Sequence, residues 1–448
     1  MVVRAADIPT QSPVREDWVP KAAYLDREFA ELEGKRLWPR VWQVACREEE
    51  LPKPGHFVTT DVGKESFLVV RSSDNKIRAF HNVCQHRGRR LVDAVAGHTH
   101  HFTCGFHAWR YNTDGTIRQI PDHQDWGTRM PVCEVGLKPL KVETWGGFVF
   151  VNMDLNAKPL IEYLGYAYEI LNPYEFEKMR FRSIRTAKLP VNWKVAVEAF
   201  NEGYHVQGTH PQALQIMDDP SCSFAHGPHG MFFQPEVGSR GLGQPSARTN
   251  KQPTADYREG IVNYVEYFER DLKGLFSDQH PIASRRLLTE VGPNASYVEV
   301  MSKMVQFWRE AAIESGSGWP DRLTPEVMAK AGIDWHIFPN FITLMTPESA
   351  ICYRIRPDGD NPESCFFDLW AIQRYAPGKE PPITREYYDP WRENKDWGEV
   401  YSQDFANAEA VQRGMKSRGF EASRTNPKQE VPVSNFHKYI YQYLDQAD

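Results

Sequence analysis

The feature that most constrains this chain is a pair of short motifs that each combine cysteine with histidine. Cys84-Gln85-His86 is followed, 17 residues later, by Cys104-Gly105-Phe106-His107. Two thiolates and two imidazoles can bind zinc or iron. Zinc motifs usually pair like with like, whereas here each motif offers one sulfur and one nitrogen. The mixed order favours a [2Fe-2S] cluster in which two cysteines hold one iron and two histidines hold the other.

Short apolar segments surround these motifs and predict a small β-domain. Turn signals such as Asp74-Asn75 and Asp114-Gly115 separate the segments, so the metal-binding motifs fall on loops. The expected strands include residues 56–59, 66–70, 77–80 and 147–151.

The remainder of the chain has a different pattern, with longer helices mixed with strands. An amphipathic pattern precedes the β-domain at residues 22–44, and a Gly, Pro and Ser-rich stretch at 218–254 predicts a loop or lid. We expect helices at 161–171, 264–273 and 392–418, and antiparallel strands at 350–356 and 365–374. The predicted class is α+β, with three parts: an N-terminal helical segment at 1–45 that packs on the catalytic domain, a β-domain at 46–158 and a larger domain at 159–448.

A second group of metal-binding residue types lies between Asn192 and Pro211. On a regular helix Glu198, Glu202 and His205 would share one face, and a carboxylate one turn before a histidine can orient its ring. His205 and His210 are about 140° apart around such a helix, so the helix must break for both rings to converge. Gly208 and Pro211 supply that break.

A non-haem iron site needs a carboxylate besides two histidines, with open positions left for O₂. Asp404, within Gln403-Asp404-Phe405, is the candidate, and Glu399 and Glu409 are its competitors. Two histidines alone are weak evidence, but their occurrence downstream of the Cys-His motifs makes a two-site iron protein the best interpretation.

Taken together, these motifs resemble the Rieske non-haem iron oxygenases, the catalytic (alpha) subunits of ring-hydroxylating enzymes. Arg87-Gly88 and Trp109-Arg110-Tyr111 are similar to the residues that flank the cluster ligands in that family, and the stretch from Asn192 to Pro211 is similar to its iron-site motif. The resemblance implies Cys84, His86, Cys104 and His107 as [2Fe-2S] ligands, and His205, His210 and Asp404 as Fe(II) ligands. It also implies a catalytic domain with a curved antiparallel sheet of the helix-grip (START-like) kind.

The resemblance gives Glu202 a further role, because the family places an acidic residue there to connect the mononuclear iron to the cluster of an adjacent subunit. Many relatives have Asp at that position. It implies a homotrimer or an α3β3 assembly, with electrons arriving from NAD(P)H through a reductase and, in some systems, a ferredoxin. Ala199 departs from the Asn that often follows the first Glu, which removes an amide near the iron.

The expected reaction is oxygenation of a small organic substrate by O₂: dioxygenation, monooxygenation or oxidative demethylation. Phe200, Asn201 and Val206 are the candidate pocket residues, and residues 341–344 and 218–254 are expected to close the pocket. Because the residues near the ligands are largely apolar, we expect a hydrophobic substrate of aromatic or polycyclic type, and a role in the breakdown of aromatic hydrocarbons. The alternative is an alkyl-ammonium or other non-arene compound.

Charge and hydropathy exclude several other classes of function. A formal net charge of −6 argues against nucleic acid as an obligatory partner, and no stretch approaches the roughly 20 apolar residues of a membrane span. The first 16 residues lack the apolar core of a signal peptide. Seven scattered cysteines do not suggest a disulfide framework, so we expect a cytoplasmic protein.

Two other functions are compatible with part of this pattern. A Rieske electron carrier with an appended domain would need no mononuclear iron, and a ligand-binding protein would need no reaction with O₂. A zinc site at the Cys-His motifs is the corresponding rival for the first metal centre.

Overall fold

The computed structural model describes residues 18–130, 134–218, 221–233 and 240–446, which form two compact units. The first, which we call the β-unit, contains residues 31–163 together with 358–360. The second, which we call the large unit, contains residues 18–30, 164–357 and 361–445 in their described parts. The first 16 residues, which lack the pattern of a signal peptide, lie outside the described residues, and so does Cys133.

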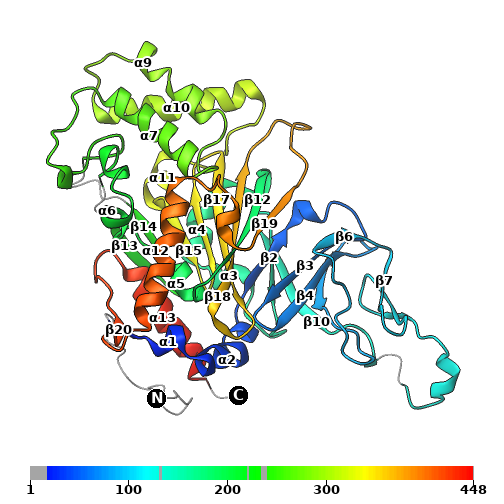
Figure 1. Ribbon diagram of the computed structural model, residues 1–448. Helices are drawn as coiled ribbons and strands as arrows, with labels where there is room; N and C mark the ends of the chain where they lie inside the picture. The colour runs from blue at the N-terminus through cyan, green and yellow to red at the C-terminus, as the bar shows by residue number, and fades with distance from the viewer. Residues whose placement is uncertain (1–17, 131–133, 219–220, 234–239, 447–448) are drawn as a thin grey trace. The chain divides into compact units, whose positions relative to one another are not determined.

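The β-unit is built on a seven-stranded sheet in the order β2-β11-β10-β5-β4-β3-β6, beside a three-stranded sheet in the order β7-β8-β9 (Figure 1). Two-residue turns join β3 to β4 and β10 to β11, and the paired strands run antiparallel, as alternating apolar segments separated by turn residues predict. The strands are β2 (Gln43–Arg47), β3 (His56–Val62), β4 (Glu65–Arg71), β5 (Ile77–His81), β6 (Ala96–His98), β7 (His101–Thr103), β8 (Arg110–Asn112), β9 (Ile117–Gln119), β10 (Pro139–Trp145) and β11 (Phe148–Asn152).

One apolar cluster of the β-unit includes both motif cysteines. Cys84 and Cys104 are buried together with Leu68, Phe102 and Trp109. The packing of Cys84 and Cys104 in this cluster therefore holds the two motif loops against the core of the β-unit.

The large unit is built on an eight-stranded sheet in the order β13-β14-β15-β16-β17-β18-β12-β19. Its strand pairs are antiparallel where their register is defined, apart from edge strand β19, which runs parallel to β12. The strands are β12 (Arg180–Leu189), β13 (Cys222–His226), β14 (His229–Phe233), β15 (Asp334–Ile337), β16 (Phe341–Met345), β17 (Ser349–Asp358), β18 (Asn361–Gln373) and β19 (Arg385–Tyr388).

Helices cover this sheet, and α12, drawn in orange in Figure 1, runs across it beside α5, α6 and α7. A short ladder between β1 (Val19–Pro20) and β20 (Ala422–Ser423) joins the N-terminal segment to the C-terminal part of the chain. The larger helices are α7 (Tyr257–Asp271), α10 (Tyr297–Ser315), α12 (Glu399–Met415) and α13 (Val431–Leu444), and the shorter ones used below are α5 (Trp193–Glu198), α6 (Val206–Thr209) and α11 (Pro325–Ala331). No described helix is long and apolar enough to cross a lipid bilayer.

The predicted α+β class is confirmed, but several element boundaries differ from the expected ones. Residues 22–44 form two helices, α1 (Ala22–Leu25) and α2 (Arg27–Arg36), because Asp26 is extended; a 3₁₀ turn carrying Pro39 follows, and β2 then begins at Gln43. Residues 161–171 break at Gly165 into α3 (Leu160–Leu164) and α4 (Tyr166–Leu171).

The stretch expected to be a loop or lid at 218–254 contains a β-hairpin. Strands β13 and β14 pair with each other, and β14 also pairs with β15, so the hairpin extends the main sheet. The prediction of a loop was wrong for these ten residues. Two short segments, which contain Phe224 and Phe232, lie on either side of a turn at Gly227 (φ +58°), and this arrangement forms a hairpin.

Candidate functional site

The two Cys-His loops of the β-unit share the same backbone hydrogen bonds. The amide of Cys84 donates to the carbonyl of Arg89 at 2.8 Å and the amide of Gly88 to that of Cys84 at 3.0 Å. In the second loop Cys104 donates to Trp109 at 2.8 Å and Ala108 to Cys104 at 3.1 Å. Gly88 and Ala108 occupy equivalent left-handed positions (φ +74° and +56°), so the loops are two copies of one turn.

Burial separates the four side chains by type. The two cysteines are buried, whereas His86 and His107 are half-buried. The imidazole rings lie 4.5 Å apart between centroids, and the Nδ1 atoms of both are inaccessible yet have no hydrogen-bond partner. Buried nitrogens of this kind are rarely left unsatisfied. Two inner sulfurs and two outer, unpartnered nitrogens fit a cluster that binds between them.

Tyr111 adds a polar contact to the inner side of this site. The Gln85 amide donates to the Tyr111 oxygen at 3.0 Å, so the Tyr111 hydroxyl is free to donate to Cys84 Sγ at 3.3 Å. Burial raises the pKa of the Cys84 thiol, and a metal partner would be needed to hold the thiolate there. Hydrogen bonds to ligand sulfurs raise the reduction potential of an iron–sulfur cluster.

The spacing of the four ligands disfavours a single zinc ion. Tetrahedral zinc with bonds of roughly 2.0–2.3 Å would draw all four ligand atoms within about 4 Å of one another. Among the described residues, His205, His210 and Asp404 place three ligand atoms within 4.8 Å of one another. The side chains of the Cys-His loops do not come this close together. A centre with two metal ions spans the wider spacing.

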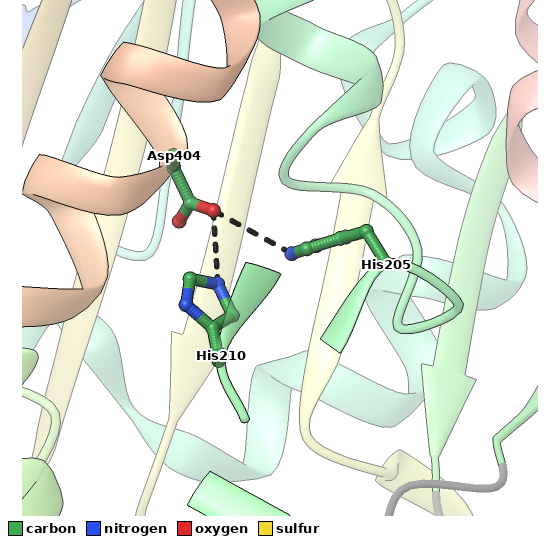
Figure 2. Close-up of side chains that lie close together, drawn as sticks. All are labelled: His205, His210 and Asp404. Atoms are coloured by element: carbon green, nitrogen blue, oxygen red, sulfur yellow. Dashed lines mark ion pairs between the residues drawn. The ribbon is translucent and has the colours of Figure 1, made fainter. Parts of the chain in front are cut away.

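Two segments of the large unit bring His205, His210 and Asp404 together (Figure 2). The histidines flank the short helix α6, and Asp404 lies on α12. Asp404 Oδ1 is 2.9 Å from His210 Nε2 and 3.6 Å from His205 Nε2. Two imidazoles and one carboxylate on one side of a metal form the facial arrangement of non-haem Fe(II) oxygenases.

The outer nitrogen of each imidazole is fixed by a neighbouring acceptor. Glu202 Oε1 lies 2.6 Å from His205 Nδ1, and Gln403 Oε1 lies 2.7 Å from His210 Nδ1. Both contacts favour a proton on Nδ1, which leaves the Nε2 lone pairs directed toward Asp404. The residues present therefore fit a divalent iron, with both rings already oriented to bind it.

The charges around His205 favour a cation at this point. Burial alone would lower the pKa of His205, but the carboxylates of Glu202 and Asp404 outweigh it and raise that pKa to about 9. Without a metal, a proton supplies the positive charge. Metal binding at His205 must displace that proton.

The chain between Asn192 and Pro211 breaks earlier than its sequence suggests. Helix α5 ends at Glu198, so Glu198 does not share a face with Glu202 and His205. Its carboxylate contacts His437 Nε2 at 2.6 Å and accepts a hydrogen bond from Tyr24 at 3.1 Å. Glu202 nevertheless reaches His205 because the chain turns between them, and its carboxylate also accepts the backbone amides of Tyr204 and His205.

The competing carboxylates are not part of this group. Glu409 accepts hydrogen bonds from Trp391 at 2.6 Å and from Arg392, away from the histidines. Glu399, at the first turn of α12, is absent from the group of ligand atoms. Geometry therefore favours Asp404 over both.

A cavity of about 280 Å³ opens beside these three converging side chains. His205, His210 and Asp404 form part of its wall. The rest is mostly apolar and comes from the sheet, from helices α6, α7, α10, α11 and α12, and from segments between these elements: Tyr174, Phe200, Val206, Met217, Phe232, Leu242, Ile261, Tyr264, Val265, Phe268, Leu272, Leu275, Phe276, Met304, Trp308, Met328, Leu344, Met345, Tyr353 and Val400.

The predicted pocket residues divide between the cavity wall and its surroundings. Phe200 and Val206 line the cavity, whereas Asn201 is buried outside the lining with both amide atoms unpartnered. Residues 341–344 contribute Leu344, and the 218–254 stretch contributes Phe232 and Leu242.

Sequence reasoning missed three residues that matter to these sites. Tyr111 and Gln403 were noticed only as neighbours of ligands, and their hydrogen bonds depend on contacts between separate segments. Asp334 lines the cavity on β15, and no motif marks it.

Comparison with known families matches both units of the chain. Residues 41–141 match the Rieske [2Fe-2S] domain, and residues 176–446 match the catalytic domain of the ring-hydroxylating alpha subunit.

Individual relatives and structures agree with these matches. A glycine betaine monooxygenase oxygenase subunit from Chromohalobacter salexigens is 31% identical over 93% of this chain and 84% of its own length. One from Pseudomonas aeruginosa is 32% identical over 44% of this chain, and the match spans about half (46%) of that relative's length. The quaternary ammonium Rieske monooxygenase CntA, solved with L-carnitine, has the same fold: TM-score 0.65 at 20% identity, covering 97% of this chain and 98% of the other.

Proposed function

Since the chain belongs to the family of Rieske non-haem iron oxygenase catalytic subunits, we propose that it is the oxygenase component of a multicomponent enzyme that oxidises a small organic substrate with O₂. Its cofactors in this family are a [2Fe-2S] cluster and Fe(II), with NAD(P)H acting through a reductase. The observation that carries the proposal is the common wall: His205, His210 and Asp404 line the same cavity as a large apolar surface.

In this proposal each site residue has a defined task. Cys84, His86, Cys104 and His107 hold the cluster, and His205, His210 and Asp404 hold the iron, which supplies O₂ activation when bound. Glu202 and Gln403 keep the two imidazoles in the tautomer that presents Nε2. The apolar wall orients the substrate and excludes water from the reacting atoms.

The proposal extends to partners and assembly. A reductase, with or without a ferredoxin, delivers electrons, and the subunits associate as a homotrimer or an α3β3 complex in the cytoplasm. Glu202 would connect His205 to a cluster ligand of the neighbouring copy. Three contacts of its carboxylate, one to the imidazole and two to backbone amides, support a fixed position for such a connection.

Two observations weigh against the rival functions. A Rieske electron carrier would have no use for two imidazoles and a carboxylate converging on an apolar cavity. A ligand-binding protein that has lost catalysis would not need both Nδ1 atoms to be anchored. The hydrophobic character of the expected substrate agrees with the largely apolar lining of the cavity.

Metal analysis and two variants test the proposal. Anaerobically reconstituted protein should contain about three irons per chain, two in the cluster and one at the histidines. His210→Ala should lose one iron and all activity while it keeps the visible spectrum of the cluster, and the exposed His100→Ala is the control. Loss of both centres in His210→Ala would contradict the ligand assignment.

Glu202→Gln tests the connection between subunits. The variant should bind both metals and slow turnover by about 100-fold or more. A neutral amide has only one acceptor oxygen, so it can accept from His205 but cannot also accept from a second imidazole as a carboxylate does. Gln207→Glu, a change on α6 outside the cavity lining, is the matched control. Product analysis by mass spectrometry then distinguishes monooxygenation, dioxygenation and demethylation.

A further inference from the structure

Asp334 places a carboxylate in the cavity wall that has no hydrogen-bond partner among the described residues. The residue is 1% exposed, and both of its carboxylate oxygens are buried without such a partner in the described part of the chain. Its register partners on the two neighbouring strands are Phe232 of β14 and Leu344 of β16. All three line the cavity, so Asp334 lies in an otherwise apolar strip of the sheet face.

The other charged residues of the cavity wall do not compensate Asp334. Glu202 and Asp404 are the other two carboxylates among the described lining residues, and both contact the imidazoles. That lining contains no lysine or arginine. Asp334 is therefore the one carboxylate of the described cavity wall that no cationic or hydrogen-bonding side chain of that wall balances.

The hydroxyl of Tyr353, in the same wall, is already committed to another acceptor. Tyr401 donates its hydroxyl proton to the Leu272 carbonyl at 3.2 Å, so Tyr353 donates its own to Tyr401, also at 3.2 Å. Burial and the charge of Glu202 raise the pKa of Asp334 well above its usual range. An unpartnered buried carboxylate is costly, and proteins retain such groups mainly where a ligand or a reaction uses them.

We propose that Asp334 determines substrate specificity by binding the positively charged nitrogen of an organic cation whose remaining body is apolar. The inference rests on the proposed oxygenase function and names the substrate class of that same cavity. A cationic nitrogen would neutralise Asp334, and Phe232 beside it offers an aromatic face on which ammonium groups also bind favourably. The apolar body would fill the part lined by Phe268, Leu272 and Met304.

The same charges exclude other substrate classes. A pure hydrocarbon would leave Asp334 buried without a partner in the complex. An anion or a betaine-like zwitterion would bring a carboxylate into a cavity whose lining has no lysine or arginine to receive it. The aromatic hydrocarbon expected from the sequence is thereby narrowed to an apolar body that carries a cation.

A binding experiment on the holoprotein tests the assignment. The probes are phenethyltrimethylammonium, its carbon isostere with a quaternary carbon in place of nitrogen, and benzylacetone, a neutral hydrogen-bond acceptor. Each is measured by calorimetry under anaerobic conditions, with the linker of the ammonium probe lengthened one methylene at a time. The wild-type protein should bind the best ammonium probe at least about tenfold more tightly than its isostere, as expected for a hydrogen-bonded or paired charge.

The variant Asp334→Asn should reduce this ratio to about one while isostere binding stays within about twofold. Asp321→Asn, which removes the same charge from an exposed position outside the cavity lining, should leave the ratio unchanged. The assignment is overturned if no ammonium probe is preferred, if benzylacetone binds more tightly than the ammonium probes, or if the preference survives in Asp334→Asn.

Oxygen uptake separates this assignment from the proposed function. Cation selectivity that depends on Asp334, together with no substrate-stimulated O₂ consumption in the presence of a reductase, would overturn the oxygenase proposal alone. Stimulated O₂ consumption with equal preference for the cation and its isostere would overturn the Asp334 assignment alone.

Discussion

Two buried aspartates of the eight-stranded sheet differ in what surrounds them. Asp368 of β18 accepts hydrogen bonds from Thr186 at 2.7 Å, Arg354 at 2.8 Å and Arg356 at 2.7 Å. Within the part of the chain that the structure describes, Asp334 of β15 has no hydrogen-bond partner for either oxygen. Burial opposes ionisation of Asp368, but Arg356 and Arg354 outweigh it and hold the pKa of this carboxyl well below its usual range.

The two aspartates lie on opposite faces of the sheet. The side chain of Phe367, next to Asp368, contacts Tyr353 of the cavity wall (ring centroids 5.3 Å apart), so Asp368 points to the other face. One face holds a charge that is fully paired and stabilises the fold. The other face holds a carboxylate without a hydrogen-bond partner among the described residues. The paired carboxylate contributes to stability, whereas the unpaired one lowers stability and can accept a ligand.

The largest effect should come from removing the paired charge. Asp368→Asn would leave Arg354 and Arg356 buried without their acceptor, so we expect a loss of about 3–5 kcal/mol in the free energy of unfolding. Chemical denaturation followed by circular dichroism measures it. A loss no larger than that of an average surface substitution would show that the two arginines find other acceptors.

The unpaired charge should behave in the opposite way. Asp334→Asn removes a carboxylate that nothing in the described cavity wall compensates, so the unliganded protein should gain about 1–3 kcal/mol in the free energy of unfolding. The same denaturation assay applies. A destabilised Asp334→Asn protein would mean that this carboxylate supports the fold and would remove the contrast between the two residues.

The pH dependence of stability should also have opposite signs. The pKa of Asp368 is lowered in the folded protein, so its contribution is present above the unfolded value of about 3.9 and is lost as pH falls. The pKa of Asp334 is raised, so its penalty is absent at low pH and grows as pH rises above about 3.9. Denaturation curves of wild type and each variant across the acid range should show the stability difference for Asp368→Asn shrinking as pH falls below that value. The difference for Asp334→Asn should grow as pH rises above it.

The smallest effect is expected at a fully exposed carboxylate with equally good geometry. Asp74 contacts Arg78 through both oxygens, at 2.6 and 2.9 Å, and this pairing lowers its pKa to about 2. Water screens the pair, so Asp74→Asn should leave the melting temperature unchanged within the error of calorimetry. A clear shift would show that hydrogen-bond geometry, rather than burial, separates Asp368 from Asp334.

Much of the β-unit could be predicted from the sequence because its information is local. The strands follow from alternating apolar residues, and the proposed cluster ligands lie within two short motifs whose loops share one backbone pattern. Breaks in helices were harder to place. Asp26 and Gly165 interrupt apolar patterns that continue past them, and α5 ends at Glu198 although the following residues suit a helix.

Less of the large unit's site could be predicted, because its parts come from segments far apart in the chain. Asp404 was selected over Glu399 and Glu409 by resemblance, and the structure supplies the physical reason: Asp404 faces both imidazoles, whereas Glu409 contacts Trp391 and Arg392. The role of Glu198 was misjudged, since Tyr24 and His437, its partners, lie near the two ends of the chain.

The sequence by itself determined the chemistry of the donors: two thiols and four imidazoles in motifs whose spacing suits iron. Residue types and short separations suffice for this, because bonding preferences belong to the side chains themselves. The tertiary structure alone decided which carboxylates are neutralised. Strand register places arginines beside Asp368 and apolar side chains beside Asp334, and only that environment sets the free energy of a buried charge.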